Sequence, residues 1–436
     1  MITKAKKTST TDRFLAQFKD IKETAFSSDT TDISQLRKYA ISYFEKLGIP
    51  TRKVETWKYT PISKALNKNW TYRSAESNFN FPEIENLQAH ELILSNNQYK
   101  EGLNPLPQNI ISSSMEAAFQ NPTDHFVKHY GSYAHITTEP LTALNTAFAK
   151  NGIYLHIPDG TVLDLPIHII TIINSEDTEC FHPRNLIHIG KNSNVKIIES
   201  TYLNTGDQKN PLFINKLSEI ICEENSFIDR YELQTNDCNK TVLVNTSQVH
   251  QTANSNFTNT VITTNSSFTR NNINIDHEGE NCETNLFGMY TLNKEAHLDN
   301  HTLINHNTPN CLSNELYAGI LNDKSTGVFN GKVYVKKDAQ KTNAFQSNRN
   351  ILLSDESTMN SKPELEIYAD DVKCSHGSTT GQLEEEALFY LRSRGISEDN
   401  ATSMLLIGFV SEIIDRIKIE ALKEHLTTAL TNNLSA

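Results

Sequence analysis

The sequence predicts a mainly β fold, a β-helix or solenoid, flanked by α-helical segments at both ends of the chain. Three observations support this prediction. From about Gly152 to Lys373, apolar residues alternate with polar ones at the period of two that is typical of strands, as in Ile167–Ile172. No long helical stripe interrupts this region, which counts against a βαβ fold. Turn-like segments recur within it about every 16 residues, and a fixed period indicates stacked coils.

The repeat consists of turn-like segments that are each followed by a short strand-like run. These segments are Asn305–Asn310, Leu321–Ser325, Lys336–Gln340, Leu353–Ser357 and Ala369–Val372. If two such units make one coil, the region holds roughly seven coils. Asparagine is abundant here, and its side chain tolerates tight turns and stacks in ladders along a repeat axis. The alternative is a β-sandwich of meandering hairpins, but the Asn-Gly and Asp-Gly turns typical of hairpins are scarce.

The pattern of apolar residues predicts an N-terminal helical domain at residues 1–80. A helix from about Thr11 carries apolar residues at spacings of three and four, and a second helix from Ser34 carries another such stripe. Gly48 fits the left-handed position just after the second helix, and Pro50 stops it.

The next 70 or so residues predict a less regular region before the solenoid begins. Residues 81–150 form a mixed α/β connecting region, with a short strand around Glu91–Leu94 and a helical patch near Ser114–Phe119. Residues 151–378 then form the parallel β-helix core.

Residues 379–436 predict a C-terminal helical domain. Thr379–Gly381 offer an N-terminal cap for its first helix, and Glu384–Glu386 crowd the first turn, where they complement the helix dipole. Ser397 caps the next helix. The buried stripe of that helix is predicted to be Ala401, Met404, Leu405, Gly408, Phe409, Ile413 and Ile417. Such a unit is too small to fold alone, so its apolar faces must rest on the solenoid, on each other or on a partner.

Composition excludes several classes of function. The 436 residues include 52 acidic and 40 basic ones, and the net charge of −12 disfavours nucleic acids and anionic membranes as partners. Apolar stretches such as Met404–Val410 are far shorter than the roughly 18 residues that span a bilayer. No apolar segment follows the basic Met1–Lys7, so we expect no secretory signal and a cytoplasmic location. We expect reduced thiols at the scattered cysteines, which are Cys180, Cys222, Cys238, Cys282, Cys311 and Cys374.

Common catalytic motifs are missing from the sequence. Without a GxxxxGK[ST] segment, we expect no direct ATP binding through a P-loop. His297, Asp299 and His301 would share one face of a strand, and with His306 they form the densest histidine cluster, which fits either a metal site or a polar solenoid face. Glu384–Glu386 suit acid/base chemistry or, as the simpler interpretation, a solvated helix start.

The segment Cys374–Gly377 is a stronger candidate for metal binding. In an extended chain, residues two apart project to the same side, so Cys374 and His376 would form a thiolate and imidazole pair suited to iron or zinc. Two ligands hold a metal poorly, and a full site would need groups from another chain. The alternative is a buried small cysteine beside an exposed histidine.

Several parts of the sequence together form a recognisable pattern, namely Glu55–Thr60, Ala344–Asp355, Lys362–Asp371, Val372–Gly381, Leu388–Ile396, Ala401 and Gly408–Phe409. They resemble the signatures of the SufB/SufD family, the core scaffold subunits of the Suf iron–sulfur cluster assembly system. Glu55–Thr60 (ETWKYT) is similar to the SufD branch. The SufB branch carries an essential cysteine on the strand that here reads Ser347–Asn350, and no cysteine stands there.

The resemblance implies a right-handed parallel β-helix in a non-catalytic subunit. It implies that the chain pairs with a SufB-like subunit through the β-helix, or forms a homodimer when the chain is isolated. It also implies that the C-terminal helices bind a SufC-like ABC ATPase. His376 and Cys374 match a histidine proposed at the SufB–SufD interface and its neighbouring cysteine. They are therefore the candidate ligands for iron or a nascent iron–sulfur cluster shared with SufB.

Two other interpretations remain open from the sequence. One is a β-helix enzyme that processes polysaccharides, although such enzymes usually act outside the cytosol and need clustered carboxylates or basic residues on one solenoid face. The other is a structural interaction module without a metal role, in which His376 only packs.

Overall fold

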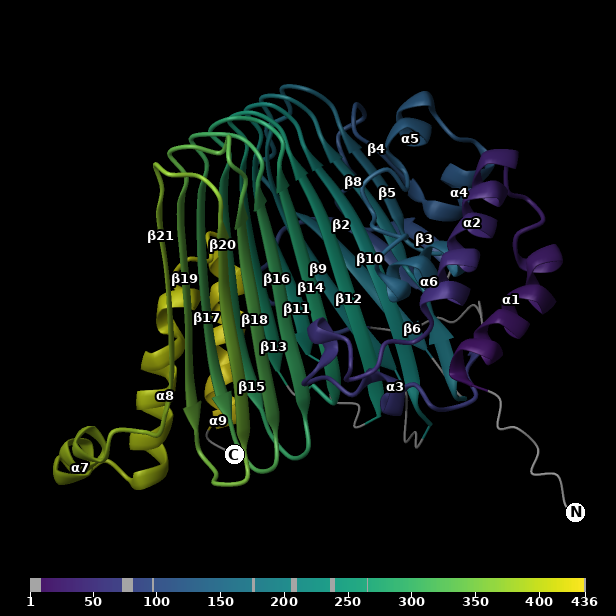
Figure 1. Ribbon diagram of the computed structural model, residues 1–436. Coiled ribbons are helices and arrows are strands. Elements are labelled where there is room, and N and C mark those ends of the chain that lie inside the picture. Colours follow the sequence, from purple (N-terminus) through teal and green to yellow (C-terminus); the bar gives the residue numbers. More distant parts are fainter. Residues whose placement is uncertain are drawn as a thin grey trace, which may run out of the picture.

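The central part of the protein is a β-solenoid of about seven turns with helices at both ends (Figure 1). The computed structural model describes residues 9–72, 81–95, 98–174, 177–204, 210–235, 240–264 and 266–434. The predicted fold class, a mainly β solenoid with flanking helices, is therefore confirmed. The basic start of the chain and Cys238 lie outside the described residues, and the domain boundaries at residues 80, 150 and 378 stay predictions.

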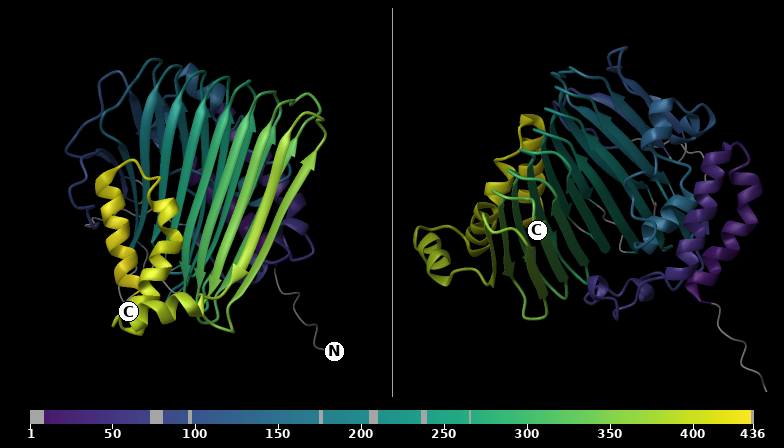
Figure 2. Two further views of the ribbon diagram at one scale, coloured as in Figure 1. Left: turned by 90° about the vertical axis from the view of Figure 1, so that its left-hand side faces the viewer. Right: turned by 45° about the horizontal axis from the view of Figure 1, so that its top comes forward.

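Two facing sheets form the solenoid, and successive strands alternate between them (Figure 2). Sheet A contains β4 (Ile111–Ser114), β5 (Ile153–Ile157), β8 (Arg184–Ile189), β10 (Leu212–Cys222), β12 (Thr241–Gln251), β14 (Phe268–His277), β16 (His297–His306), β18 (Thr326–Val335) and β20 (Thr358–Ile367), with β7 (Glu179–Phe181) and β1 (Thr71–Tyr72) at its side. Sheet B contains β3 (Gln98–Glu101), β2 (His90–Ser95), β6 (Ile167–Asn174), β9 (Asn194–Asn204), β11 (Phe227–Thr235), β13 (Asn256–Thr264), β15 (Glu283–Leu292), β17 (Leu312–Leu321), β19 (Asn343–Leu352) and β21 (Lys373–Gly381). The pairs are parallel, apart from the antiparallel β4 and β3 at the first end.

The turns between strands explain the abundance of asparagine. One corner of the solenoid places Asn192, Asn225, Asn254, Asn281 and Asn310 in the left-handed region, with φ between 55° and 63°. Asparagine adopts this region more readily than most residues. The side-chain amide of Asn225 donates to Asn192 Oδ1 at 3.1 Å, and that of Asn281 donates to Asn254 Oδ1 at 3.0 Å. The predicted asparagine ladder is therefore present, and the predicted turn segments do separate the strands from β16 to β21.

The N-terminal helices cover the outer face of sheet A near its first coils (Figure 1). They are α1 (Thr10–Ala25), α2 (Thr31–Leu47), the 3-10 turn η1 (Glu55–Trp57), α3 (Ile62–Ala65), α4 (Met115–Gln120), α5 (Asp124–His129) and α6 (Pro140–Phe148). Every residue of α6 is buried, because the helix lies between α2 and β10. Gly48 ends α2 with φ 66°, as predicted, and its N–H donates to the carbonyl of Phe44.

The C-terminal helices are α7 (Glu385–Ser393), α8 (Glu398–Ile414) and α9 (Glu420–Leu434), of which α8 and α9 lie beside sheet B and α7 packs on α8 (Figure 2). Two predictions about them were wrong. Thr379–Gly381 do not cap α7, because they pair with β19 as the end of β21. In α8, Ala401 and Ile413 are buried as predicted, but Met404 and Gly408 are exposed, because the helix turns Leu406 and Val410 toward the sheet. Ser397 caps α8 as predicted. Among the described residues, no helix has the length and apolar character needed to cross a bilayer.

A buried ion pair ties the N-terminal region to the solenoid. Arg184 on β8 donates to the Glu219 carboxylate of β10 at 2.6 Å, and both side chains are fully buried. The same carboxylate accepts the backbone N–H groups of Gly131, Tyr133 and Ala134, which follow α5. One acidic group thus fixes the loop and neutralises the buried guanidinium.

We predict that Glu219→Ala lowers the free energy of unfolding by about 3–5 kcal/mol, because it leaves the Arg184 charge buried without a partner. Urea denaturation followed by circular dichroism measures this change. The matched control is Lys324→Ala, which removes an exposed ion pair with Glu356 and should change stability little. Equal effects of the two substitutions would contradict the role given to Glu219.

Candidate functional site

The last coil of the solenoid is open. Strand β21 pairs with β19 on one side, and no other described strand continues sheet B beyond it (Figure 2). At the first end, the last strand pair of each sheet is antiparallel, with β3 against β2 and β4 against β5. Most of β21 is exposed, and Phe345, Ile367 and Tyr368 add exposed apolar surface nearby. An unpaired strand edge of this kind is a template for pairing with another chain.

Cys374 and His376 both lie on this edge strand. In the ladder, Cys374 is opposite Ala344 and His376 is opposite Gln346, whose side chains are buried. Because strand residues alternate between faces, the two side chains share one side of the strand, as the sequence predicted, and this side is the inward face. Cys374 is half-buried against Ala344, and burial raises the pKa of its thiol. His376 is exposed at the open end.

A buried polar column lies behind His376. The Gln346 side-chain amide donates to Glu315 Oε1 at 2.9 Å, and the Thr302 hydroxyl donates to Glu315 Oε2 at 2.6 Å. Burial raises the pKa of Glu315 to about 7. Gln346 Oε1 has no hydrogen-bond partner among the described residues. The column therefore places the carboxyl group of Glu315, with its raised pKa, against Gln346, and Gln346 is the ladder neighbour of His376.

The cluster predicted around Asp299 has a structural role. His297, Asp299 and His301 do share a strand face, but Asp299 pairs with Arg270 and accepts a hydrogen bond from Thr60. Arg270 also lies over the Trp57 ring, 4.1 Å from its centroid. These contacts anchor the Glu55–Thr60 segment to sheet A, beside a groove of about 500 Å³. Both contacts use Asp299 Oδ2, and His297, Asp299 and His301 are not among the described groups whose ligand atoms lie close enough to share a metal, so the structure favours the polar-face interpretation.

His306 belongs to a different group. Its Nδ1 lies 3.2 Å from Nδ1 of His277 on the neighbouring coil, and both rings are buried close to the Cys311 thiol. The sequence patterns did not predict this group, although the spacing from His277 to Cys282 equals that from His306 to Cys311. A group of histidines near α5 was also not predicted, because its members are far apart in the chain.

Helix α7 offers a second open surface. Its side chains include Phe389 and Tyr390, which are 75% and 57% exposed, and none of its residues, all of them described, is buried. It packs mainly on α8 and projects from the body (Figure 1). Glu384–Glu386 are exposed, which agrees with the solvated helix start. Exposed aromatic side chains on a projecting helix are suited to a protein partner.

Comparisons with known proteins agree with this geometry. Residues 171–409 match the SufBD core domain of the SUF system for FeS cluster assembly, and residues 8–169 match the SufBD protein N-terminal region. An iron-sulfur cluster assembly SufBD family protein of Synechocystis sp. is 31% identical over 93% of this chain and 92% of its own length. The iron-sulfur cluster assembly proteins SufD of Escherichia coli and Bacillus subtilis are 26% and 24% identical, over 94% and 91% of this chain and 95% and 93% of their own lengths.

We predict that Glu315→Gln alters the pH dependence of stability. Between the ordinary glutamate pKa of 4.5 and the folded value of about 7, the folded chain holds a proton that the unfolded chain has released. The native protein therefore loses stability as pH rises through this window. The variant should gain about 2 kcal/mol relative to the native protein between pH 5 and pH 8, measured by urea denaturation. Glu295→Gln, at an exposed site, is the control, and a pH-independent difference for Glu315→Gln would contradict the prediction.

Proposed function

The chain belongs to the SufBD family of the SUF system for iron–sulfur cluster assembly, and from this premise we propose that it is a non-catalytic scaffold subunit of an assembly complex. The observation that carries the proposal is the open last coil, which presents His376 and Cys374 beside an unpaired strand edge. The absence of cysteine from Ser347–Asn350 supports assignment to the SufD branch, in which sulfur is received elsewhere.

In this proposal, β21 pairs with the corresponding edge of a SufB-like subunit. A parallel β-helix ends in backbone groups that still require hydrogen-bond partners, and a second solenoid supplies strands of matching spacing. An isolated chain would satisfy the same edge with a second copy of itself. A cytoplasmic location is part of the proposal, because the free cysteines require a reducing compartment.

Iron or a nascent cluster is the cargo of this interface. Thiolate and imidazole groups are suited to iron, and Cys374 and His376 lie on one face of an exposed strand. Two groups leave the coordination of iron incomplete, so the SufB-like subunit would supply the remaining ligands. The burial that raises the pKa of Cys374 must be relieved, or offset by the metal charge, before its thiolate forms.

We predict that His376→Ala lowers the iron and sulfide content of the assembled complex severalfold while the fold and the partners are retained. The complex is purified anaerobically after co-expression, and its iron and acid-labile sulfide are quantified. His135→Ala is the matched control, because His135 is also exposed but follows Ala134, which binds Glu219 on β10 and not the last coil. Equal cluster content in His376→Ala and native complexes would exclude the ligand role.

The C-terminal helices are the proposed docking site of a SufC-like ABC ATPase. The chain lacks a P-loop, so any ATP dependence must come from a partner. Helix α7 supplies exposed Phe389 and Tyr390 for such a contact, while α8 fixes the unit to β15 and β17. Aromatic residues of this kind commonly dominate the binding energy of protein interfaces.

We predict that the double substitution Phe389→Ala/Tyr390→Ala weakens ATPase binding at least tenfold, because it removes the two exposed aromatic side chains of α7. Co-purification and isothermal titration with the SufC-like protein measure the effect, and truncation after Gly381 should abolish binding. Tyr39→Ala, on α2, removes a comparably exposed aromatic group and serves as the control. Unchanged affinity in the double variant would refute the docking site.

A further inference from the structure

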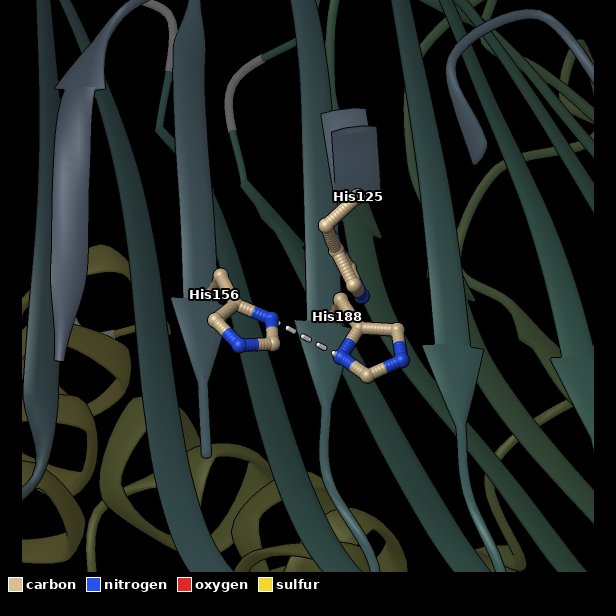
Figure 3. A group of neighbouring side chains, drawn as sticks. All are labelled: His125, His156 and His188. Atoms are coloured by element: carbon tan, nitrogen blue, oxygen red, sulfur yellow. Dashed lines mark hydrogen bonds between the residues drawn. The ribbon is translucent and has the colours of Figure 1, made fainter. Parts of the chain in front are cut away.

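A second group of chemically capable residues lies at the opposite end of the solenoid from His376. His156 on β5 and His188 on β8 are direct neighbours in the parallel ladder and point to the outer face of sheet A. Helix α5 contributes His125, whose side chain points toward the other two (Figure 3). The proposed scaffold role uses none of these three residues.

The nitrogen atoms of this group have the spacing of metal ligands. Nδ1 of His156 and Nδ1 of His188 lie 3.2 Å apart. Two ligands about 2.0–2.1 Å from a tetrahedral ion are separated by about 3.3 Å. The ring of His125 lies over this pair, with its centroid 4.1 Å from each of the other two (Figure 3). One nitrogen from each ring falls within 4.8 Å of the others, so a small side-chain rotation brings all three around one ion.

Neighbouring groups orient two of the rings. Nδ1 of His125 lies 3.1 Å from the Tyr154 hydroxyl, which leaves Nε2 directed into the group, and this buried Nε2 has no partner among the described residues. Nε2 of His188 lies 3.2 Å from Glu223 Oε1. A carboxylate that accepts from one ring nitrogen and leaves the other free for a metal is a recurring arrangement in metal sites.

The imidazole rings of this group favour the neutral form, which has a nitrogen lone pair for a metal. Burial, together with the neighbouring imidazoles, lowers the pKa of His125 to about 3, and the same two causes lower the pKa of His156. Metal ligands must be unprotonated imidazoles, so these rings need not lose a proton before they bind a metal at neutral pH. His125 and His156 are only partly buried, which leaves a route for the ion and a position for a water ligand.

We propose that His125, His156 and His188 form a binding site for one divalent first-row transition-metal ion, such as Zn(II) or Fe(II). Imidazole nitrogen is a ligand that these ions favour, and three imidazoles leave a fourth position open. Glu223 and Tyr154 are positioning residues, because each holds a ligand ring through its second nitrogen. The site is independent of the proposed cluster interface, since β5 and β21 lie at opposite ends of the solenoid.

The test uses the full chain, purified free of metal and titrated anaerobically with Co(II). The native protein should bind one equivalent at this site with the visible absorption bands of a tetrahedral ion, and Zn(II) should displace it. His125→Gln and His156→Gln should each weaken Co(II) binding at least tenfold. Glu223→Gln should weaken it about 10- to 100-fold, which is the usual loss when a carboxylate partner of a ligand is removed.

Three controls isolate the site. His135→Gln changes an exposed histidine near α5, His306→Gln removes the other buried histidine group, and His376→Ala tests independence from the cluster interface. All three should retain the Co(II) spectrum. Zn(II) should also raise the Tm of the native protein. The variants His125→Gln and His156→Gln should fold without metal, but Zn(II) should not raise their Tm. Native-like spectra in both of these variants, or loss of the spectrum only in His306→Gln, would overturn the proposal.

Discussion

The hydrogen-bonded stacking of each coil on the one before it is the constraint on which this structure depends. Each inner strand of the solenoid uses its N–H and C=O groups on two neighbours, so the register of one coil fixes the register of the next. The same stacking places equivalent residues in columns, which explains the asparagine corner and the stacked pair of Glu315 and Gln346, which Thr302 contacts from the facing sheet. It also ensures that an end without a neighbour retains a row of unsatisfied backbone groups.

The two ends of the solenoid meet this constraint differently. At the first end, antiparallel strands and the helices from α4 to α6 complete the coils, and the buried Arg184–Glu219 pair holds the covering loop in place. A buried charge pair of this kind is stable only when nearly all of its hydrogen-bonding groups have partners, so it is suited to a contact that stays formed. At the last end, the exposed groups are mostly small and polar, as in Ser375, Ser378 and Thr380. Such an edge resists random aggregation yet remains competent for a specific partner.

The sequence predicted what is local or periodic. Alternating strands, turn spacing and the Gly48 helix end follow from residue types in sequence order, and they are present. Features created by stacking were harder to predict. His156 and His188 are 32 residues apart, and His277 and His306 are 29 apart, so they meet only once the register is known. The predicted buried stripe of α8 was partly wrong, because apolar residues cover more than one face of this helix. Contact with sheet B decides which face is buried, and it buries Val410 and leaves Met404 exposed.

The two edges of the last coil are not equivalent, and this bears on the orientation of a partner. Strand β20, at the edge of sheet A, contains Pro363, which has no N–H group and is tolerated in sheets mainly at edges. Its charged side chains are also engaged, since Lys362 pairs with Glu55 and Glu364. Strand β21 has no proline and keeps a complete set of backbone donors and acceptors. A strand from a second solenoid would therefore find a full set of backbone donors and acceptors along β21 and an incomplete set along β20.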